Sequence, residues 1–241
     1  MKQELFTIRA NTVLTDDVWE MVLEGNTSEI QRPGQFVQLA LPELFLRRPI
    51  SVCDCKPGRL TLVYKLVGAG PREMAGMRPG TRLDLLTGLG NGFTLEKSGA
   101  APMLVGGGVG IPPLYFLAKK LLAQGKQVTA AFGFNTAAQA FYLEKFQTLG
   151  VSVQVATLDG SLGRKGLVTE LVAQADAYSY LYACGPEPML KAVCSISKTS
   201  GQFSFEARMG CGFGACMGCS CKTKYGNKRI CKEGPVLEKE E

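Results

Sequence analysis

The stretch VGGGVGIPPL, residues 105–114, decides the fold of the central part of the chain. It follows a short apolar run, 102–105, and leads into the helical spacing of residues 114–124. Glycines at such a turn let the backbone approach a pyrophosphate, and the following helix offers free amides at its N-terminus. Pro112 and Pro113 suit the first helical turn, where a missing N–H has no cost. The stretch therefore predicts a strand–turn–helix unit. Because it is not a strict GxGxxG, a tight turn without a ligand remains the alternative.

Strands and helices alternate on both sides of this stretch. Repeated β–α units imply a parallel sheet with helices on both faces. The expected strands are 102–105, 127–132, 151–156 and 177–183, and the expected helices are 114–124, 137–149, 166–174 and 186–197.

A second turn, ACGPEPM at 183–189, again ends a strand and begins a helix. Two such turns at one edge of a parallel sheet frame a crevice for an extended nucleotide. The candidate nucleotide-binding residues are Gly106, Gly107, Gly108, Gly110, Cys184, Gly185 and Pro186.

The first hundred residues are β-rich. Turn residues separate the short apolar or alternating runs, and this spacing predicts a small antiparallel barrel or sandwich. The expected strands are 5–10, 18–23, 35–39, 60–64 and 82–86.

Composition excludes several classes of protein. The chain has 241 residues and a net charge of +6, without the basic run and interleaved aromatics of a nucleic-acid groove. No apolar stretch approaches the roughly 20 residues that cross a bilayer, and the alternating N-terminus predicts a strand instead of a signal peptide. We expect a soluble cytoplasmic protein.

The chain has nine cysteines and no histidine. The odd count argues against a disulfide framework. Without histidine there is no His-ligated zinc, no Rieske cluster and no Ser–His or Cys–His couple. Cofactor chemistry is the economical explanation.

Four cysteines have the spacing Cys211-x4-Cys216-x2-Cys219-x11-Cys231 on a glycine-rich segment. Three thiolates on one loop and a fourth from a later strand match the plant-type [2Fe–2S] arrangement. A four-cysteine zinc site is the alternative, although zinc ribbons present two C-x2-C pairs and this segment has one. Cys221 competes with Cys219, because residues two apart on an extended chain point the same way.

Arg47–Ser51, in the β-rich part, combines an arginine and a serine that could jointly bind phosphate oxygens. A solvated strand end is the ordinary interpretation of such a pair.

Three motifs of the chain, taken in order, resemble those of the ferredoxin–NADP reductase superfamily. They are Arg48-Pro49-Ile50-Ser51, the turn at 106–110 and Cys184-Gly185-Pro186. With the segment 209–219, the whole chain resembles the electron-transfer subunits of class B dihydroorotate dehydrogenases.

This resemblance implies three modules: an FAD-binding antiparallel barrel at 1–99, an NAD-binding α/β domain at 100–201 and a [2Fe–2S] module at 202–241. It assigns the cluster to Cys211, Cys216, Cys219 and Cys231. It carries FAD contacts over to Arg48, Pro49, Ile50 and Ser51, and places a strand against the flavin at Val63, Tyr64 and Lys65. The family's Gly-x-Gly-Thr turn is Gly68-Ala69-Gly70-Pro71 here, so Pro71 lacks the hydroxyl and the N–H that could contact phosphate, while Gly70 keeps its amide.

The resemblance also implies a function in pyrimidine biosynthesis. Electrons would pass between NAD and the FMN of a separate catalytic subunit that oxidises dihydroorotate to orotate, in a heterotetramer with two copies of each subunit. The strand end FGFNT at 132–136 has no basic residue for a 2′-phosphate, which favours NAD over NADP. Related subunits of hydrogenases, sulfide dehydrogenases or NADH-dependent ferredoxin:NADP oxidoreductases are the alternative, and a zinc-stabilised nucleotide-binding regulator is a third.

Overall fold

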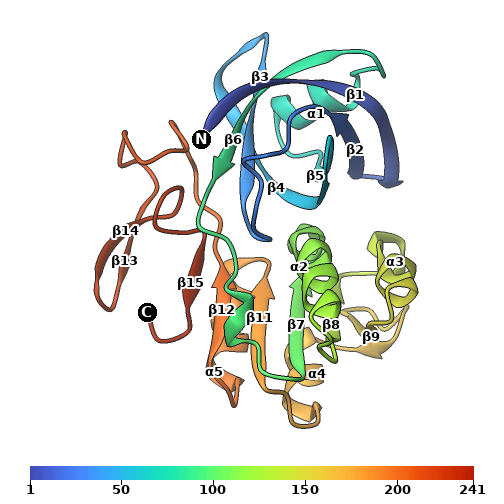
Figure 1. Ribbon diagram of the computed structural model, residues 1–241. Coiled ribbons are helices and arrows are strands. Elements are labelled where there is room, and N and C mark those ends of the chain that lie inside the picture. The colour runs from blue at the N-terminus through green and yellow to red at the C-terminus, as the bar shows by residue number, and fades with distance from the viewer. The chain divides into compact units, whose positions relative to one another are not determined.

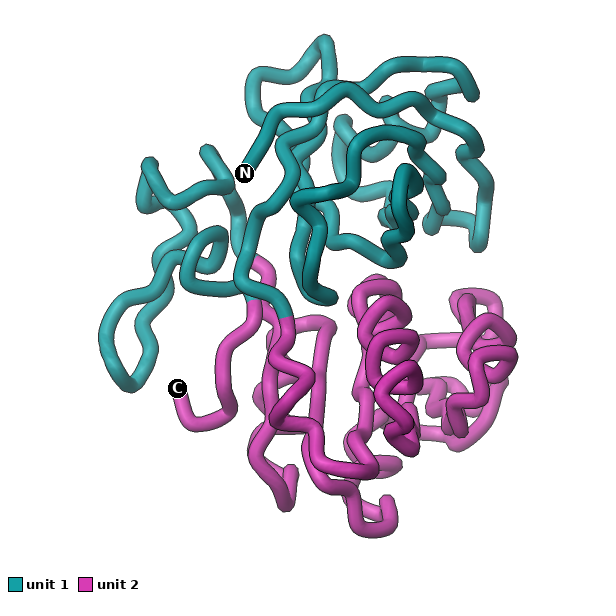
Figure 2. The backbone as a smooth tube through the Cα atoms, in the orientation of Figure 1, with its two compact units in different colours: residues 1–92, 207–235 teal, residues 93–206, 236–241 magenta.

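Two sets of strands organise the chain, which the computed structural model describes in full from Met1 to Glu241. The contacts divide it into two units (Figure 1 and Figure 2). Unit 1 comprises residues 1–92 and 207–235, and unit 2 comprises residues 93–206 and 236–241. The cysteine-rich segment therefore groups with the N-terminal strands. The three-module division at 1–99, 100–201 and 202–241 stays a prediction.

Six antiparallel strands of unit 1 close into a barrel in the order β1-β2-β5-β4-β3-β6. Val37 and Leu39, two apart on β3, are fully buried and fill its interior. The elements are β1 (Lys2–Thr15), β2 (Val18–Glu24), β3 (Phe36–Leu41), β4 (Leu44–Lys56), β5 (Arg59–Lys65), the helix α1 (Ala69–Ala75) and β6 (Arg82–Leu89), and a hairpin of β13 (Ser220–Thr223) and β14 (Gly226–Arg229) completes the unit.

The strand β4 was not among the five strands predicted from the sequence. Its arginines and Pro49 break the alternation of apolar residues that marks a strand. Pro49 pairs with Gln38 of β3, and the pairing of β4 with β5 begins only at Val52. A proline without an N–H is tolerated at such an edge-like position.

Unit 2 is built on a seven-stranded sheet in the order β10-β9-β8-β7-β11-β12-β15. Its strands are parallel except β15, which runs antiparallel to β12. The strands are β7 (Pro102–Gly107), β8 (Thr129–Phe134), β9 (Ser152–Thr157), β10 (Arg164–Lys165), β11 (Tyr180–Cys184), β12 (Gly201–Ser204) and β15 (Val236–Glu238). The helices are α2 (Ile111–Ala123), α3 (Leu143–Thr148), α4 (Val168–Gln174) and α5 (Glu187–Ile196), with 3-10 turns at Leu95–Lys97, Gly108–Gly110 and Ala137–Gln139.

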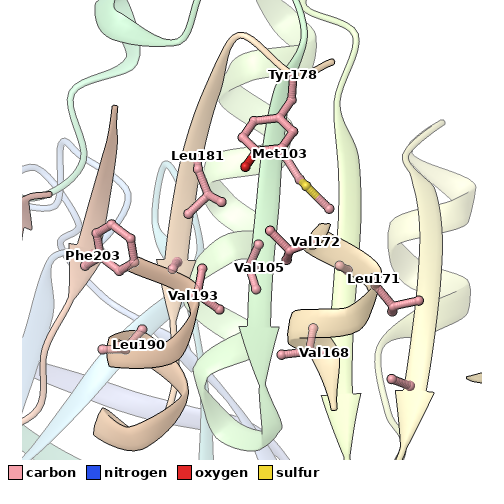
Figure 3. Packing of buried hydrophobic residues seen from close by; sticks show 13 residues of the cluster. Met103, Val105, Val168, Leu171, Val172, Tyr178, Leu181, Leu190, Val193 and Phe203 are labelled. Atoms are coloured by element: carbon pink, nitrogen blue, oxygen red, sulfur yellow. The ribbon is translucent and has the colours of Figure 1, made fainter. Parts of the chain in front are cut away.

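Helices cover both faces of this sheet, as predicted. Figure 3 shows one face, where Val168 and Val172 of α4 and Val193 of α5 pack against strand residues such as Val105. On the other face, α3 packs through Phe146, whose ring lies 4.8 Å from that of Phe132 on β8. The predicted combination of an antiparallel barrel and a parallel-sheet α/β domain is confirmed.

The prediction of one helix over 137–149 is wrong in its first half. A 3-10 turn covers Ala137–Gln139, and α3 begins only at Leu143. Between them Tyr142 has a φ of 68° and is buried. Its ring packs edge-on against Tyr115 of α2 at 5.4 Å, so aromatic packing overrides the local helical preference.

None of the helices combines the length and the apolar character that crossing a bilayer demands.

Candidate functional site

The four predicted cluster cysteines lie in unit 1 as two pairs. The Sγ of Cys211 accepts N–H hydrogen bonds from Ala215 at 3.2 Å and Cys216 at 3.4 Å, and the two thiols of Cys211 and Cys216 interact. The Sγ of Cys219 accepts the N–H of Cys231 at 3.4 Å, and these two thiols interact as well.

No three Cys, Asp or Glu side chains of the chain converge on one point as ligands of a single metal ion. A mononuclear zinc site needs four ligands around one ion. A [2Fe–2S] cluster takes two protein ligands at each iron. The two thiol pairs match the two protein ligands that each iron of such a cluster takes.

The thiols of the two pairs differ in acidity. Burial opposes ionisation of Cys211, but hydrogen bonds from the N–H groups of Cys216, Phe213 and Ala215 and from the Cys216 thiol outweigh it and lower its pKa to about 6. Burial, followed by the hydrogen bond with Cys219, raises the pKa of Cys231 to about 12. Since only thiolates ligate metal, Cys231 would have to lose its proton when iron binds.

Several hydrogen bonds hold the cysteine loop to the rest of unit 1. Arg229 donates from Nη1 to the carbonyl oxygen of Gly214 at 2.7 Å and forms an ion pair with Glu233. Nδ2 of Asn91 donates to the carbonyl oxygen of Glu233 at 2.9 Å. The backbone N–H of Asn91 donates to the carbonyl oxygen of Gly234 at 2.8 Å. The loop is thus anchored from its own hairpin and from the end of the barrel.

The structure distinguishes Cys219 from Cys221. Cys219 is buried and precedes β13, whereas Cys221 lies within β13 opposite Lys228 of β14. The Cys231 N–H is directed at the sulfur of Cys219. The geometry therefore brings Cys219 to the fourth cysteine.

In the barrel, the predicted arginine and glycine come together. A Cβ at Gly70 would lie 2.5 Å from Nε of Arg48, so the arginine side chain packs directly against this glycine of α1. Arg48 donates from Nη1 to the carbonyl oxygens of Leu46 and Arg47 and pairs with no carboxylate. Arg47, by contrast, pairs with Asp84 at 2.8 Å. Arg48 is thus the arginine with a charge left for a phosphate.

The other predicted barrel residues have different surroundings. Pro49, Ile50 and Ser51 are half-buried on β4. Pro71 occupies the first turn of α1, where N–H groups have no partner within the helix, so its missing N–H costs the helix nothing. A phosphate contact from Pro71 gains no support from this position.

The strand 63–65 is mostly engaged within the barrel. Tyr64 is buried, its hydroxyl donates to Oδ1 of Asn11 at 2.9 Å, and burial raises its pKa to about 12. Lys65 pairs with Asp17 at 3.0 Å, and Val63 is buried. A flavin contact from this strand would therefore use its backbone or Val63.

In unit 2, the two predicted turns lie against each other. Cys184 on β11 pairs with Gly106 on β7, so both strands end at one edge. A Cβ at Gly110 would lie 2.3 Å from the Cys184 carbonyl oxygen, and one at Gly185 would lie 3.1 Å from the backbone nitrogen of Gly107. Close backbone packing therefore accounts for Gly110 and Gly185, whereas a Cβ at Gly106 or Gly107 would meet side chains.

Gly108 differs from its neighbours. Its φ is +50°, and a Cβ there would meet nothing within 4 Å. At this residue the backbone borders open space, which is what a bound pyrophosphate requires. Pro186, on the second turn, packs near Gly107 at the N-terminus of α5.

An acidic residue lies beside the strand end at 132–136, which has no basic residue. The backbone N–H of Asp159, after β9, donates to the carbonyl oxygen of Asn135, which follows β8. Hydrogen bonds from the hydroxyl and N–H of Ser161 lower the pKa of the Asp159 carboxyl, so it is ionised. A carboxylate at this position accepts from ribose hydroxyls and repels a 2′-phosphate.

Sequence reasoning missed two polar residues beside the predicted sites. Glu206 follows β12, and desolvation raises the pKa of its carboxyl. Burial and then the charge of Glu206 raise the pKa of Cys184 to about 12, which keeps that thiol neutral. An acidic residue directly after the alternating run GQFSF at 201–205 is the signal that could have found it. The second residue, Gln38, gives no such signal.

Two family models match parts of this chain. The family model of the iron–sulfur cluster binding domain of dihydroorotate dehydrogenase B matches residues 206–241, and that of the oxidoreductase NAD-binding domain matches residues 104–195. A solved structure of an NADH-dependent reduced ferredoxin–NADP oxidoreductase superposes with a TM-score of 0.88 at 29% identity, covering 98% of this chain and 88% of that one. A ferredoxin reductase of carbazole 1,9a-dioxygenase, at 23% identity and a TM-score of 0.69 over 81% of this chain and 65% of its own, shares the fold.

Two curated relatives are similar over nearly their whole length, and both are named dihydroorotate dehydrogenase B (NAD(+)), electron transfer subunit. The relative from Shouchella clausii is 43% identical over 98% of this chain and 96% of its own. The relative from Bacillus caldolyticus is 41% identical over the same shares. The chain belongs to the family of dihydroorotate dehydrogenase B electron transfer subunits.

Proposed function

We propose that this chain passes electrons between NAD and the FMN of a separate catalytic subunit that oxidises dihydroorotate to orotate in pyrimidine biosynthesis. The observation that carries the proposal is the pairing of Cys211 with Cys216 and of Cys219 with Cys231 on an anchored loop of the barrel unit. When bound, FAD exchanges two electrons with the nicotinamide and the [2Fe–2S] cluster carries single electrons, so the protein supplies binding and position.

Each group has its own binding residues in this proposal. Arg48 binds an FAD phosphate, supported by its unpaired charge and by its contact with Gly70. Pro49, Ile50 and Ser51 present the edge of β4 to the same group. The backbone of Gly106, Gly107, Gly108 and Gly110 binds the NAD pyrophosphate, and Cys184, Gly185 and Pro186 border the nicotinamide end.

The ligands of the cluster are Cys211, Cys216, Cys219 and Cys231, and Cys221 is a neighbouring thiol. The contact of the Cys231 N–H with Cys219 supports this choice. NAD is favoured over NADP because Asp159 puts a carboxylate beside the strand end that would otherwise receive a 2′-phosphate.

The catalytic partner docks on the cysteine loop in this proposal, in a cytoplasmic heterotetramer with two copies of each subunit. Phe213 and Met217 on this loop are 42% and 55% exposed, which is unusual for large apolar side chains. Apolar side chains around a redox centre fit a protein interface.

The test uses the full chain reconstituted with FAD, iron and sulfide. We expect it to reduce an artificial dye with NADH and to form no orotate from dihydroorotate. Adding the FMN-containing subunit should then couple orotate formation to NAD reduction. Orotate formation by the chain alone would contradict the proposal.

A second candidate is the same electron-transfer role in another complex. The 29% identity to the NADH-dependent ferredoxin–NADP oxidoreductase over nearly the whole chain is the observation that favours it. Co-purification separates the two functions: an FMN-containing barrel protein supports the first, and a larger flavin- and iron–sulfur-containing subunit supports the second.

A further inference from the structure

Gln38 is a buried glutamine whose side chain has no hydrogen-bond partner in the chain. It lies on β3 with no exposed surface, and both its Nε2 and its Oε1 are unpartnered. Its backbone carbonyl oxygen, in contrast, accepts from Nη1 of Arg47. Burying a carboxamide removes its hydrogen bonds to water, which is unfavourable unless another group replaces them. The side chain therefore requires a hydrogen-bonding group that the chain itself does not supply.

The carboxamide of Gln38 lies against the cysteine loop. A Cβ built on Gly212 would be 1.8 Å from Nε2 and 2.4 Å from Cδ of Gln38. Gly212 has a φ of +77° and directly follows Cys211. A side chain at position 212 would be strained at this φ and would push the Gln38 carboxamide out of its place. The amide is thus held next to the first cysteine of the loop.

The alternation of β3 explains how a polar side chain comes to lie there. Val37 and Leu39 are fully buried and point into the barrel, so Gln38 points out of it. A glutamine on the outer face would normally meet water. Here the cysteine loop, which belongs to the same unit, covers it.

The polarity of the site decides which end of the amide is used. Backbone N–H groups of Ala215 and Cys216 already point at the Cys211 sulfur. Thiolate and sulfide sulfurs accept hydrogen bonds and donate none, so the N–H end of the carboxamide must face them. Hydrogen bonds to the sulfurs are one of the factors that set the potential of an iron–sulfur cluster.

We infer that Gln38 donates a hydrogen bond from Nε2 to a sulfur of the cluster at its Cys211 end, and so raises the reduction potential of the cluster. The inference rests on the proposed [2Fe–2S] assignment. A donor stabilises the reduced cluster more than the oxidised one, because reduction adds negative charge to the sulfurs.

The test compares Gln38→Met with wild type in the full chain loaded with FAD, iron and sulfide. Methionine keeps the length of the side chain and removes the N–H. We expect the EPR-monitored midpoint potential to fall by about 59 mV, which is a tenfold change in a one-electron equilibrium. A proton coupling that disappears from the ENDOR spectrum in D2O should also be lost in the variant.

Gln35→Met is the matched control. Gln35 is also buried in unit 1, but its Oε1 accepts the N–H groups of Gln31 at 2.8 Å and Arg32 at 2.9 Å. Its loss should lower thermal stability and leave the potential unchanged. Gln38→Leu, which removes the donor with a shorter apolar side chain, serves if the methionine variant does not fold, and should also lower the potential.

An unchanged potential and an unchanged exchangeable coupling in a Gln38 variant with an intact cluster would overturn the inference. The carboxamide would then be satisfied by a buried water, and the proposed function would stand. A wild-type preparation without iron and labile sulfide would instead overturn the proposed function, and the inference with it.

Discussion

Two glycines of the nucleotide turn allow a sharp test, because they are glycine for different reasons. In Gly110→Ala the new methyl would lie 2.3 Å from the carbonyl oxygen of Cys184, about 1 Å short of an ordinary contact at 3.4 Å. Both atoms are fixed by backbone, so β11 and the turn must separate. Overpacking of this kind costs about 1–3 kcal/mol, and we expect a loss near the upper end in the free energy of unfolding of unit 2.

Gly108→Ala is the matched control for packing. Its methyl would meet nothing within 4 Å, and the positive φ of +50° costs about 1 kcal/mol. The methyl would occupy the open space assigned to the NAD pyrophosphate. We therefore expect a small stability loss and about a tenfold weaker affinity for NADH, equivalent to about 1.4 kcal/mol.

The two units can be followed separately in one urea titration. Four of the five α-helices, α2–α5, lie in unit 2, so circular dichroism at helical wavelengths mainly reports its unfolding. The single tryptophan, Trp19, lies on β2 of the barrel, and its fluorescence reports unit 1. Gly110→Ala should shift the first signal and leave the second unchanged.

Two results would refute this reasoning. An unchanged dichroism midpoint in Gly110→Ala would mean that the packing of the two turns is not as described. Wild-type affinity for NADH in Gly108→Ala would mean that the pyrophosphate does not use this turn.

Three further predictions concern unit 1. Cys219→Ser should lose the visible absorption of the cluster and Cys221→Ser should keep it; retention in the first and loss in the second would reverse the ligand assignment. Arg48→Ala should weaken FAD binding at least tenfold, measured by flavin fluorescence during dialysis, with wild-type retention as the contrary result. Arg47 lowers the pKa of Asp84 below its ordinary value of 3.8, so the pair stabilises the barrel above that pH and the contribution is lost as the pH falls below it. Asp84→Asn should lower the free energy of unfolding by about 1 kcal/mol at pH 7 and make this free energy less dependent on pH in the acid range. An unchanged pH dependence in the acid range would mean that the pair contributes nothing to stability.

The sequence was most informative where spacing alone determines chemistry. The intervals between the four cysteines predicted the cluster. A loop that wraps around two irons allows only certain spacings between its cysteines, and it needs glycines where the backbone approaches the cluster. The glycines at 106–110 likewise predicted a turn at the edge of a parallel sheet. Cys219 was preferred over Cys221 only through the family resemblance, since alternation places both on the same side; in the structure the contact with Cys231 separates them.

Other features depend on contacts between distant residues. The helix expected at 137–149 begins late because Tyr142 packs on Tyr115 of another helix. In the run FVQLAL, at 36–41, Gln38 is a polar residue between apolar ones, which is the pattern of an outward-facing position on a half-buried strand. Its burial comes from Gly212, far along the chain, and no local pattern announces it.

The most direct test of the central claim is a count of iron and acid-labile sulfide in the purified chain, with an EPR spectrum after reduction by dithionite. The account predicts about two irons and two sulfides per chain and the signal of one unpaired electron in the reduced [2Fe–2S] state. A colourless protein with one zinc per chain and no EPR signal would contradict it.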